Sequence, residues 1–297
     1  MRYGYLSLLA SLGIYIAAIV GFNLLGGVIV LAVYGIDVKN ADPTGLILIN
    51  GFSQIVVLIG LPLVLCKGLH IEIRETMHLF RPQKGHIALF LLAIPLTISA
   101  QMFGSALSSI WMDFLSLFPD LYSQLLEIQK LMDDMMAQLV KIETPFELFI
   151  MLIGVALIPA ITEEFFFRGF LFTNIERSGE YLKTAMAVML TSLAFGASHM
   201  SPFNLPGLAL LGALFAWMMV TSRTIYVGMF AHFFNNALIV VILYIFQYDK
   251  QLSESLTGST SIPPEQSLPI LFISAGALYW LAKVFDKRAK KLTIESI

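Results

Sequence analysis

The sequence contains little charge and almost no cysteine. Charged residues make up 13% of its 297 residues, and the single cysteine, Cys66, has no second cysteine with which to form an intramolecular disulfide. A soluble domain carries about 25% charged residues, and a small secreted scaffold depends on several disulfides. The formal net charge of −2 provides no polybasic surface for nucleic acid. These deficits exclude disulfide-rich secreted scaffolds, nucleic-acid-binding domains and ordinary water-soluble globules.

Apolar residues take the place of the missing charge. The set Ala, Val, Ile, Leu, Met, Phe, Trp, Tyr and Cys accounts for 58% of the chain, and the mean hydropathy is +0.81. This composition excludes disorder and collagen and is typical of a membrane protein. Because a hydrocarbon core of about 30 Å is crossed by roughly 20 apolar helical residues, we predict eight spans, at residues 5–34, 45–66, 87–112, 146–174, 184–200, 205–221, 224–247 and 268–285.

The distribution of Lys and Arg predicts how these spans are oriented. With the N-terminus inside the cell, 14 of the 18 Lys and Arg residues fall on the cytoplasmic side. The positive-inside rule therefore favours an N-in and C-in orientation. We predict an all-α, polytopic integral membrane helix bundle that forms a single membrane domain over residues 1–297. As its location we expect a bacterial cytoplasmic membrane in preference to the endoplasmic reticulum.

Two connections between spans are long enough to have structure of their own. In residues 113–147, Leu and Met recur at helical spacing between acidic residues, which predicts an amphipathic helix on the non-cytoplasmic face. The basic loop 67–86 contains His70, His78 and His86. Their regular spacing permits a metal site, but no Cys or carboxylate cluster accompanies them, so ordinary solvated histidines are the favoured interpretation.

Three ionisable residues lie close together within the fourth span. Each costs roughly 2.5–3.5 kcal/mol at the centre of a membrane helix. Glu164 and Arg168 are four residues apart and share one helix face, so they can neutralise each other. Glu163 points about 100° away and has no local partner. A purely structural ion network explains the pair but not Glu163, which is a candidate general base.

The two histidines outside the basic loop both lie in spans. His199 ends the fifth span and His232 lies in the seventh. At 1.5 Å per residue, Glu163, His199 and His232 fall roughly 12–22 Å deep, so we expect them to meet near the middle of the bilayer. Asn236 is four residues from His232 and shares its helix face, and Phe195 has the same relation to His199, which places the phenyl ring below the imidazole.

Together these residues resemble a known family. The patterns Glu-Glu-x-x-x-Arg, Phe-x-x-x-His and His-x-x-x-Asn, in this order on consecutive membrane helices, are similar to those of the CPBP intramembrane proteases. That family includes the Rce1-type CAAX prenyl endopeptidases and bacterial bacteriocin-processing and immunity proteins. The matching residues are Glu163, Glu164, Arg168, Phe195, His199, His232 and Asn236. By this resemblance the catalytic core helices occupy residues 146–247.

The resemblance implies hydrolysis of a peptide bond in a membrane-associated or lipid-modified peptide. Glu163 and His199 would activate a water, and His232 and Asn236 would donate hydrogen bonds to the tetrahedral oxyanion. Glu164, Arg168 and Phe195 would support these four residues. No cofactor is expected, although Glu163, His199 and His232 are the residues that would bind Zn²⁺ if it were present. The implied partners are a peptide or membrane-protein substrate and the lipid bilayer, and not nucleic acid.

Three other readings compete with this one. A proton-coupled transporter would use the same charges as a relay, but the chain shows no internal repeat to support transporter architecture. A non-catalytic immunity or scaffold protein on the same fold is a second alternative, and the intact residue set argues against it. A rhomboid-like serine protease would use Ser198 and His232 but lacks the glycine expected after Ser198.

Overall fold

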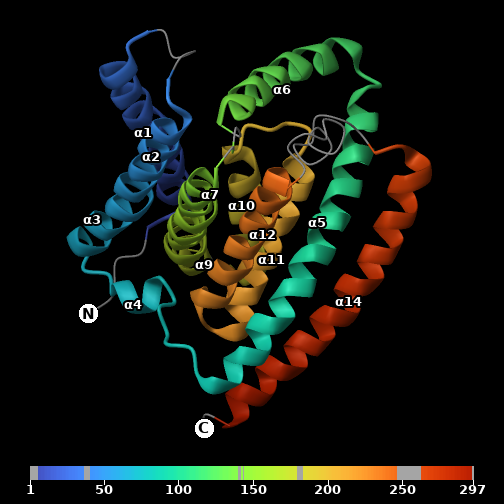
Figure 1. Ribbon diagram of the computed structural model, residues 1–297. Coiled ribbons are helices and arrows are strands. Elements are labelled where there is room, and N and C mark those ends of the chain that lie inside the picture. The colour runs from blue at the N-terminus through green and yellow to red at the C-terminus, as the bar shows by residue number, and fades with distance from the viewer. Residues whose placement is uncertain are drawn as a thin grey trace.

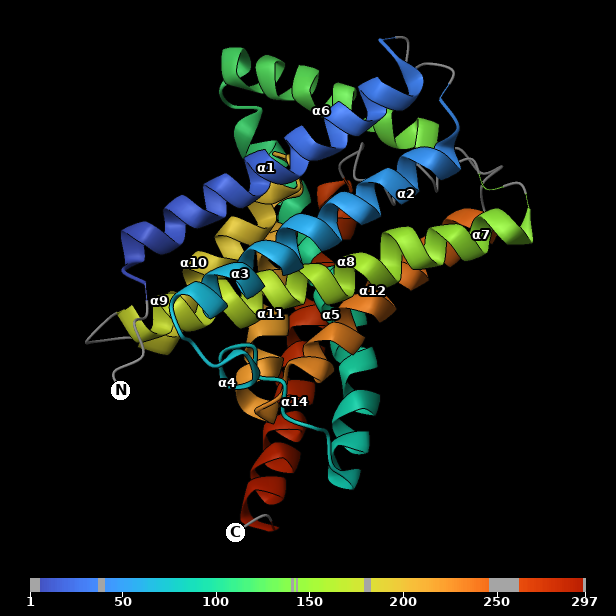
Figure 2. The same cartoon turned by 90° about the vertical axis from the view of Figure 1, so that its left-hand side faces the viewer.

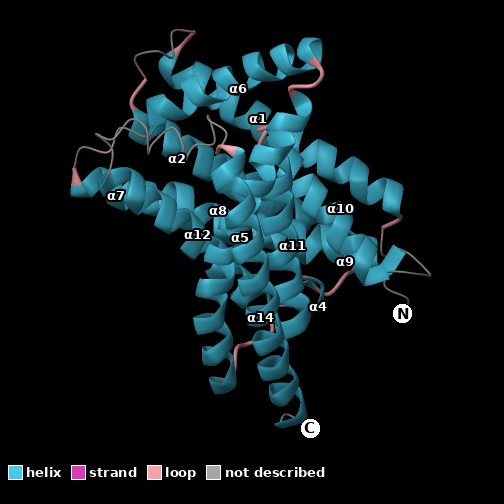
Figure 3. Ribbon diagram, turned by 90° about the vertical axis from the view of Figure 1, so that its right-hand side faces the viewer, coloured by secondary structure: helices cyan, strands magenta, loops and turns pink. Residues whose placement is uncertain are grey.

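The computed structural model describes residues 6–36, 41–139, 142, 144–178, 183–245 and 262–295. Regular secondary structure in these ranges is entirely helical (Figure 3). Within them, seven helices are long and apolar enough to cross a membrane. The predicted all-α polytopic bundle is therefore confirmed, and the protein is a multi-pass integral membrane protein.

The helices follow one another along the chain, and several spans combine successive helical segments. In order they are α1 Leu8–Tyr34, α2 Pro43–Gln54, η2 Ile55–Ile59, α3 Gly60–Gly68, α4 Ile73–Thr76, η3 Lys84–His86, α5 Ile87–Leu115, α6 Pro119–Leu139, α7 Pro145–Met151, η4 Leu152–Leu157, α8 Ile158–Glu163, η5 Glu164–Leu171, α9 Phe172–Ser178, α10 Lys183–Ser198, α11 Leu205–Ser222, α12 Ile225–Ile245 and α14 Pro264–Glu295. Segments η2, η4 and η5 are π-helical, and η3 is a 3₁₀-helix.

Of the eight predicted spans, the one at 184–200 is too short to count among the seven candidate membrane-spanning helices in the described ranges. It corresponds to α10, which has 16 residues and a rise of about 24 Å, less than a hydrocarbon core of about 30 Å. The chain turns back after Ser198 and re-enters the bundle as α11. Helix α10 alone is therefore too short to cross the hydrocarbon core.

The helices form two groups with different tilt. Helices α1, α2–α3 and α7–α9 run as one inclined layer (Figure 2), while α5 and α14 pack side by side along the opposite edge of the bundle (Figure 1). Helices α10, α11 and α12 lie between these groups and contact the helix that contains α8 and η5. The central position of α10–α12 brings their side chains to the charged residues of the fourth span.

Helix α6 crosses one end of the bundle (Figure 1). It lies within the segment 113–147, for which an amphipathic helix is predicted. Its acidic residues are interspersed along the sequence with Leu, Ile and Met. Ser201, in the turn between α10 and α11, donates a hydrogen bond from Oγ to Gln129 Oε1 at 3.1 Å. The Tyr122 and Phe203 rings pack with their centroids 5.5 Å apart. Helix α6 is therefore attached to the turn that follows α10.

The basic loop closes the other end of the bundle. Thr173 Oγ1 donates to Thr76 O at 2.8 Å, and Ile225 N donates to His78 O at 3.1 Å. His78 is half-buried beside Phe172, with ring centroids 6.4 Å apart, and burial lowers the pKa of its imidazole. The expectation of a solvated histidine is therefore wrong for His78, because the loop folds back onto the helix ends.

Helices α5 and α11 approach each other closely at two glycines. A Cβ atom on Gly104 would lie 3.0 Å from Gly207 Cα, and a Cβ atom on Gly207 would lie 2.9 Å from Gly104 O. These neighbours are main-chain atoms, so no side-chain rotation can make room. Small residues permit such close helix contacts in membranes.

We predict that Gly207→Ala destabilises the protein by about 1–3 kcal/mol, because the added methyl group forces the two backbones apart. Thermal or denaturant unfolding in detergent measures the effect. Gly27→Ala on α1 is the matched control, since nothing lies within 4 Å of a Cβ atom there. An equal loss of stability in both variants would contradict the close contact.

Candidate active site

The helix that carries Glu163 and Glu164 is wound irregularly. The π-helix η4 precedes α8, and a second π-helix, η5, begins at Glu164. π-Helical turns are rare and occur frequently at functional sites. Because a π-turn contains more residues than an α-turn, it changes which helix faces the following side chains occupy. The two glutamates lie where α8 passes into η5.

Glu164 and Arg168 form the expected ion pair within η5. Arg168 Nη1 donates to Glu164 Oε1 at 2.8 Å, and both side chains are fully buried. Arg168 Nη2 also donates to Gly212 O on α11 at 3.0 Å. The guanidinium carbon lies 4.3 Å from the Phe195 ring centroid and 5.5 Å from that of Phe215. Arg168 therefore links η5 to α10 and α11, a role that helical spacing alone does not reveal.

His232 is held between Glu164 and two aromatic rings. Its Nδ1 lies 3.0 Å from Glu164 Oε1. The imidazole stacks on Phe215 at 5.1 Å and meets the Phe195 ring edge-on at 5.7 Å. An ionised carboxylate only accepts hydrogen bonds, so Nδ1 carries a proton and donates a hydrogen bond to Glu164 Oε1. The second nitrogen, Nε2, is left to face Glu163.

Glu163 has a buried oxygen that no described residue satisfies. Its Oε2 lies 3.9 Å from His232 Nε2, which is beyond hydrogen-bond distance. The atom accepts no hydrogen bond within the described part of the chain, yet the side chain keeps 14% of its surface exposed. Glu163 Oε2 and His232 Nε2 therefore face each other without a direct hydrogen bond.

His199 lies immediately after α10, and its ring is exposed. Its Nδ1 lies 2.8 Å from Phe195 O. A carbonyl oxygen only accepts, so Nδ1 holds the proton and Nε2 keeps its lone pair. The imidazole packs against the Phe195 ring with centroids 4.7 Å apart and the rings tilted by 59°, which confirms the predicted contact. The Phe195 ring thus contacts both imidazoles and the Arg168 guanidinium.

Asn236 lies on the same helix as His232 but has different partners. Its Nδ2 donates to Val155 O on η4 at 3.2 Å, and its Oδ1 accepts from Asn235 Nδ2 at 3.3 Å. Asn235 is buried, whereas Asn236 is partly exposed. In the described part of the chain Asn236 makes no hydrogen bond to Glu163 or His232. The other six motif residues form one cluster of contacting side chains. Asn236 lies one helical turn from His232 on α12 and is bonded to the η4 backbone instead.

The sequence also offered two alternative catalytic groups, a zinc site and a Ser198 nucleophile. Among the residues that the structure describes, no group of three or more His, Cys, Asp and Glu is placed to hold a metal ion. Glu163, His199 and His232, the residues named for Zn²⁺, form no such group in the described ranges, and metal dependence stays a prediction. Ser198 Oγ donates to Phe195 O at 2.7 Å, so its hydroxyl is occupied by the main chain.

Comparison with known families identifies the segment that contains the cluster. Residues 145–238 match the model of the family described as type II CAAX prenyl endopeptidase Rce1-like. This segment is Rce1-like. It extends from the first turn of α7 into α12, covers about a third of the chain and includes all seven motif residues. The family resemblance that the three motifs indicate is therefore confirmed for residues 145–238. Searches among curated proteins and among solved structures give no match.

We predict that Arg168→Met in the Rce1-like segment lowers the free energy of unfolding by roughly 3–5 kcal/mol, because it leaves the Glu164 carboxylate buried without its cation. Unfolding in detergent measures the loss. The control is Lys290→Met, which breaks an exposed pair of the same spacing, Lys290 to Asp286, and is expected to cost less than about 1 kcal/mol. Similar losses in both variants would argue against the buried pair as a stabilising element.

Proposed function

We propose that the protein is an intramembrane endopeptidase that hydrolyses a peptide bond in a membrane-associated or lipid-modified peptide. The match of residues 145–238 to the Rce1-like family supports the protease class. One observation carries the mechanism: Glu163 Oε2, which is buried and accepts no hydrogen bond from the residues that the structure describes, lies 3.9 Å from His232 Nε2. A base and a hydrogen-bond donor are thus aimed at the same small space.

In the proposed first step, Glu163 and His199 activate a water molecule. His199 Nε2 keeps its lone pair, because Nδ1 is bonded to Phe195 O, so it can accept a hydrogen bond from the water. Glu163 takes the proton, and the water oxygen forms a bond to the carbonyl carbon of the peptide. The exposed edge of the Glu163 side chain and the exposed His199 ring provide access for water.

The second step places negative charge on the carbonyl oxygen. His232 Nε2–H donates to this oxygen, and its second donor is Asn236 Nδ2–H, which exchanges Val155 O for the substrate. Donors fixed before reaction stabilise such charge more effectively than mobile water. Glu163 then passes its proton to the departing nitrogen as the carbon–nitrogen bond breaks. The products are a carboxylic acid and an amine.

Glu164, Arg168 and Phe195 act as positioning residues in this proposal. Glu164 Oε1 accepts from His232 Nδ1 at 3.0 Å and so turns Nε2 toward Glu163. Arg168 holds Glu164 in place and balances its charge. Phe195 packs against both imidazoles.

We predict that Glu163→Gln and His199→Ala each reduce proteolysis by about 10²–10⁴-fold, the range for loss of a general base. The assay reconstitutes each variant in vesicles with lipid-modified and unmodified peptides and detects cleavage by mass spectrometry. Melting temperatures should stay near that of the parent protein. His70→Asn is the control, since it lies outside the cluster and Asn accepts the positive φ of 54° at this site. Unchanged cleavage in both test variants would refute the mechanism.

We also propose that the reaction needs no metal ion, because the donor atoms around Glu163 are not gathered about one point. The purified enzyme should keep full activity after chelator treatment that leaves its metal content far below one ion per chain, as measured by elemental analysis. Loss of activity that Zn²⁺ restores would instead establish a metal mechanism.

A further inference from the structure

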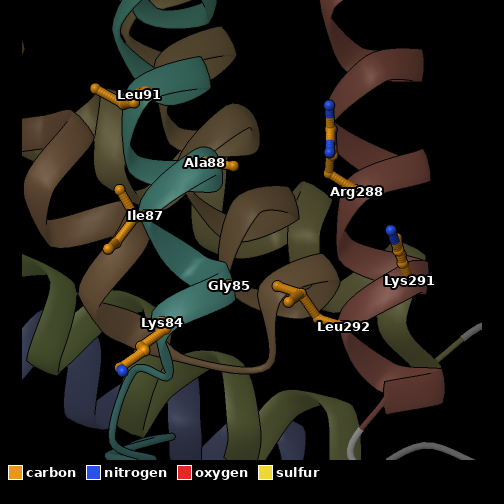
Figure 4. Close-up of a pocket in the computed structure, with 8 residues that line it drawn as sticks. All are labelled: Lys84, Gly85, Ile87, Ala88, Leu91, Arg288, Lys291 and Leu292. Atoms are coloured by element: carbon orange, nitrogen blue, oxygen red, sulfur yellow. The ribbon is translucent and has the colours of Figure 1, made fainter.

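The turn that carries His199 is held by elements outside the Rce1-like segment. It comprises residues 199–204 and joins α10 to α11. Helix α5 has contacts of different kinds at its two ends. Its start lines a cavity of about 370 Å³ with the last turns of α14 (Figure 4), whereas its end and the following helix α6 pack against the turn. Both helices precede residue 145, so the matched segment does not supply this support by itself.

Three successive residues of the turn are fixed by α5 or α6. Ser201 Oγ donates to Gln129 Oε1 on α6 at 3.1 Å, and Trp111 Nε1 on α5 donates to Pro202 O at 3.0 Å. The Phe203 side chain, 1% exposed, is buried in an apolar cluster with side chains from both helices. The main chain and the side chains of the turn therefore have partners on the same two helices.

Gln129 is a polar residue at a buried position of α6, with 5% of its surface exposed. Its Nε2 donates to Asp133 Oδ1 at 2.9 Å, and Ser201 Oγ in turn accepts from Asn204 Nδ2 at 2.9 Å. A chain of hydrogen bonds thus runs from α6 through the turn to the residue before α11. Burying an amide is costly unless it is hydrogen-bonded, and an apolar side chain would fill the same space. The bond to Ser201 is therefore what a glutamine supplies at this position.

The backbone of the turn needs such support at Met200. This residue has a φ of 51°, in the left-handed region, which an L-residue with a Cβ atom adopts only at a cost. Such residues persist when the surrounding structure holds them in place. Met200 lies between His199 and Ser201, so its conformation sets the direction of the imidazole relative to the bonded part of the turn. The contact of His199 Nδ1 with Phe195 O at 2.8 Å depends on that direction.

We propose that Gln129 and Trp111 are positioning residues for His199. Their bonds to the turn keep His199 Nδ1 on the Phe195 carbonyl oxygen and so leave the lone pair of Nε2 available to a water molecule. The kinetic consequence of this arrangement rests on the proposed proteolytic function. Its structural consequence, a single orientation and tautomer of the His199 ring, is measured without substrate.

The structural test is ¹⁵N NMR of the full-length protein in detergent with ring-labelled histidine, at about pH 8, where an ordinary imidazole is neutral. The His199 signal is assigned by its absence from His199→Ala. In the parent protein it should report a proton on Nδ1 alone. Gln129→Met keeps the length of the side chain but not its bond to Ser201, so a mixture of tautomers should appear. Gln124→Met, at an exposed position of the same helix, is the matched control and should leave the signal unchanged.

The kinetic test measures peptide cleavage by the same variants and by Trp111→Phe, which keeps an aromatic ring beside Phe114 but removes the N–H group. Gln129→Met and Trp111→Phe should each lower kcat by about 10-fold and change KM by less than about twofold, because a misplaced group slows the reaction without weakening substrate binding. Gln124→Met should have the kcat of the parent protein.

Variants at Ser201 separate the hydrogen bond from general packing. Ser201→Ala removes the donor and should reproduce the effect of Gln129→Met, whereas Ser201→Thr keeps the hydroxyl group and should behave like the parent protein. Combining Ser201→Ala with Gln129→Met should lower kcat by about 10-fold and not about 100-fold, since both changes break the same bond. A lower melting temperature with an unchanged His199 signal and kcat would overturn the proposal. A parent protein that cleaves no peptide would refute the proposed function, and the His199 signal would still decide whether Gln129 positions the ring.

Discussion

The Glu164 carboxylate is the interaction on which the rest of the site depends. One of its oxygens, Oε1, accepts hydrogen bonds from both Arg168 Nη1 and His232 Nδ1. This single atom therefore joins η5 to α12, while the other end of the Arg168 guanidinium reaches the α11 backbone at Gly212. Buried charges are tolerated only when they are paired and hydrogen-bonded, so three helices must pack in one arrangement for the network to exist.

Aromatic packing completes this arrangement. Phe195 and Phe215 pack against both the Arg168 guanidinium and the His232 imidazole. Gly228 contributes space, since a Cβ atom there would lie 3.4 Å from Glu164 Oε2. The result is a buried set of paired charges beside one partly exposed residue, Glu163. Such separation of fixed supports from an accessible group is what electrostatic preorganisation requires.

The two ends of the bundle have different characters. At one end, α6 is attached to the turn after α10 and so lies next to His199, the most exposed member of the cluster. At the other end, the basic loop is hydrogen-bonded to α9 and α12, and cations line the cavities between helix ends. Helix α6 carries four acidic residues and one lysine, whereas basic residues line the cavities at the opposite end. This polarity along the bundle agrees with the predicted orientation, which stays a prediction.

The sequence alone determined the class of fold and indicated the candidate reactive residues. Long apolar runs can be satisfied in a bilayer only by helices, and charges within such runs are rare enough to mark a site. The Glu164–Arg168 pair and the Phe195–His199 contact also followed from sequence, because both join residues that are four positions apart.

Contacts between helices were decided only by the tertiary structure. Helical spacing does not say which neighbouring helix a buried group faces, so the bonds of Arg168 to Gly212 and of His232 to Glu164 were not predictable. The π-helix η5 has no sequence signature and sets the side-chain directions after Glu163. His78 became half-buried because its loop folds back onto helices distant in sequence. Local periodicity determines which residues share a face, and packing between distant segments determines what that face contacts.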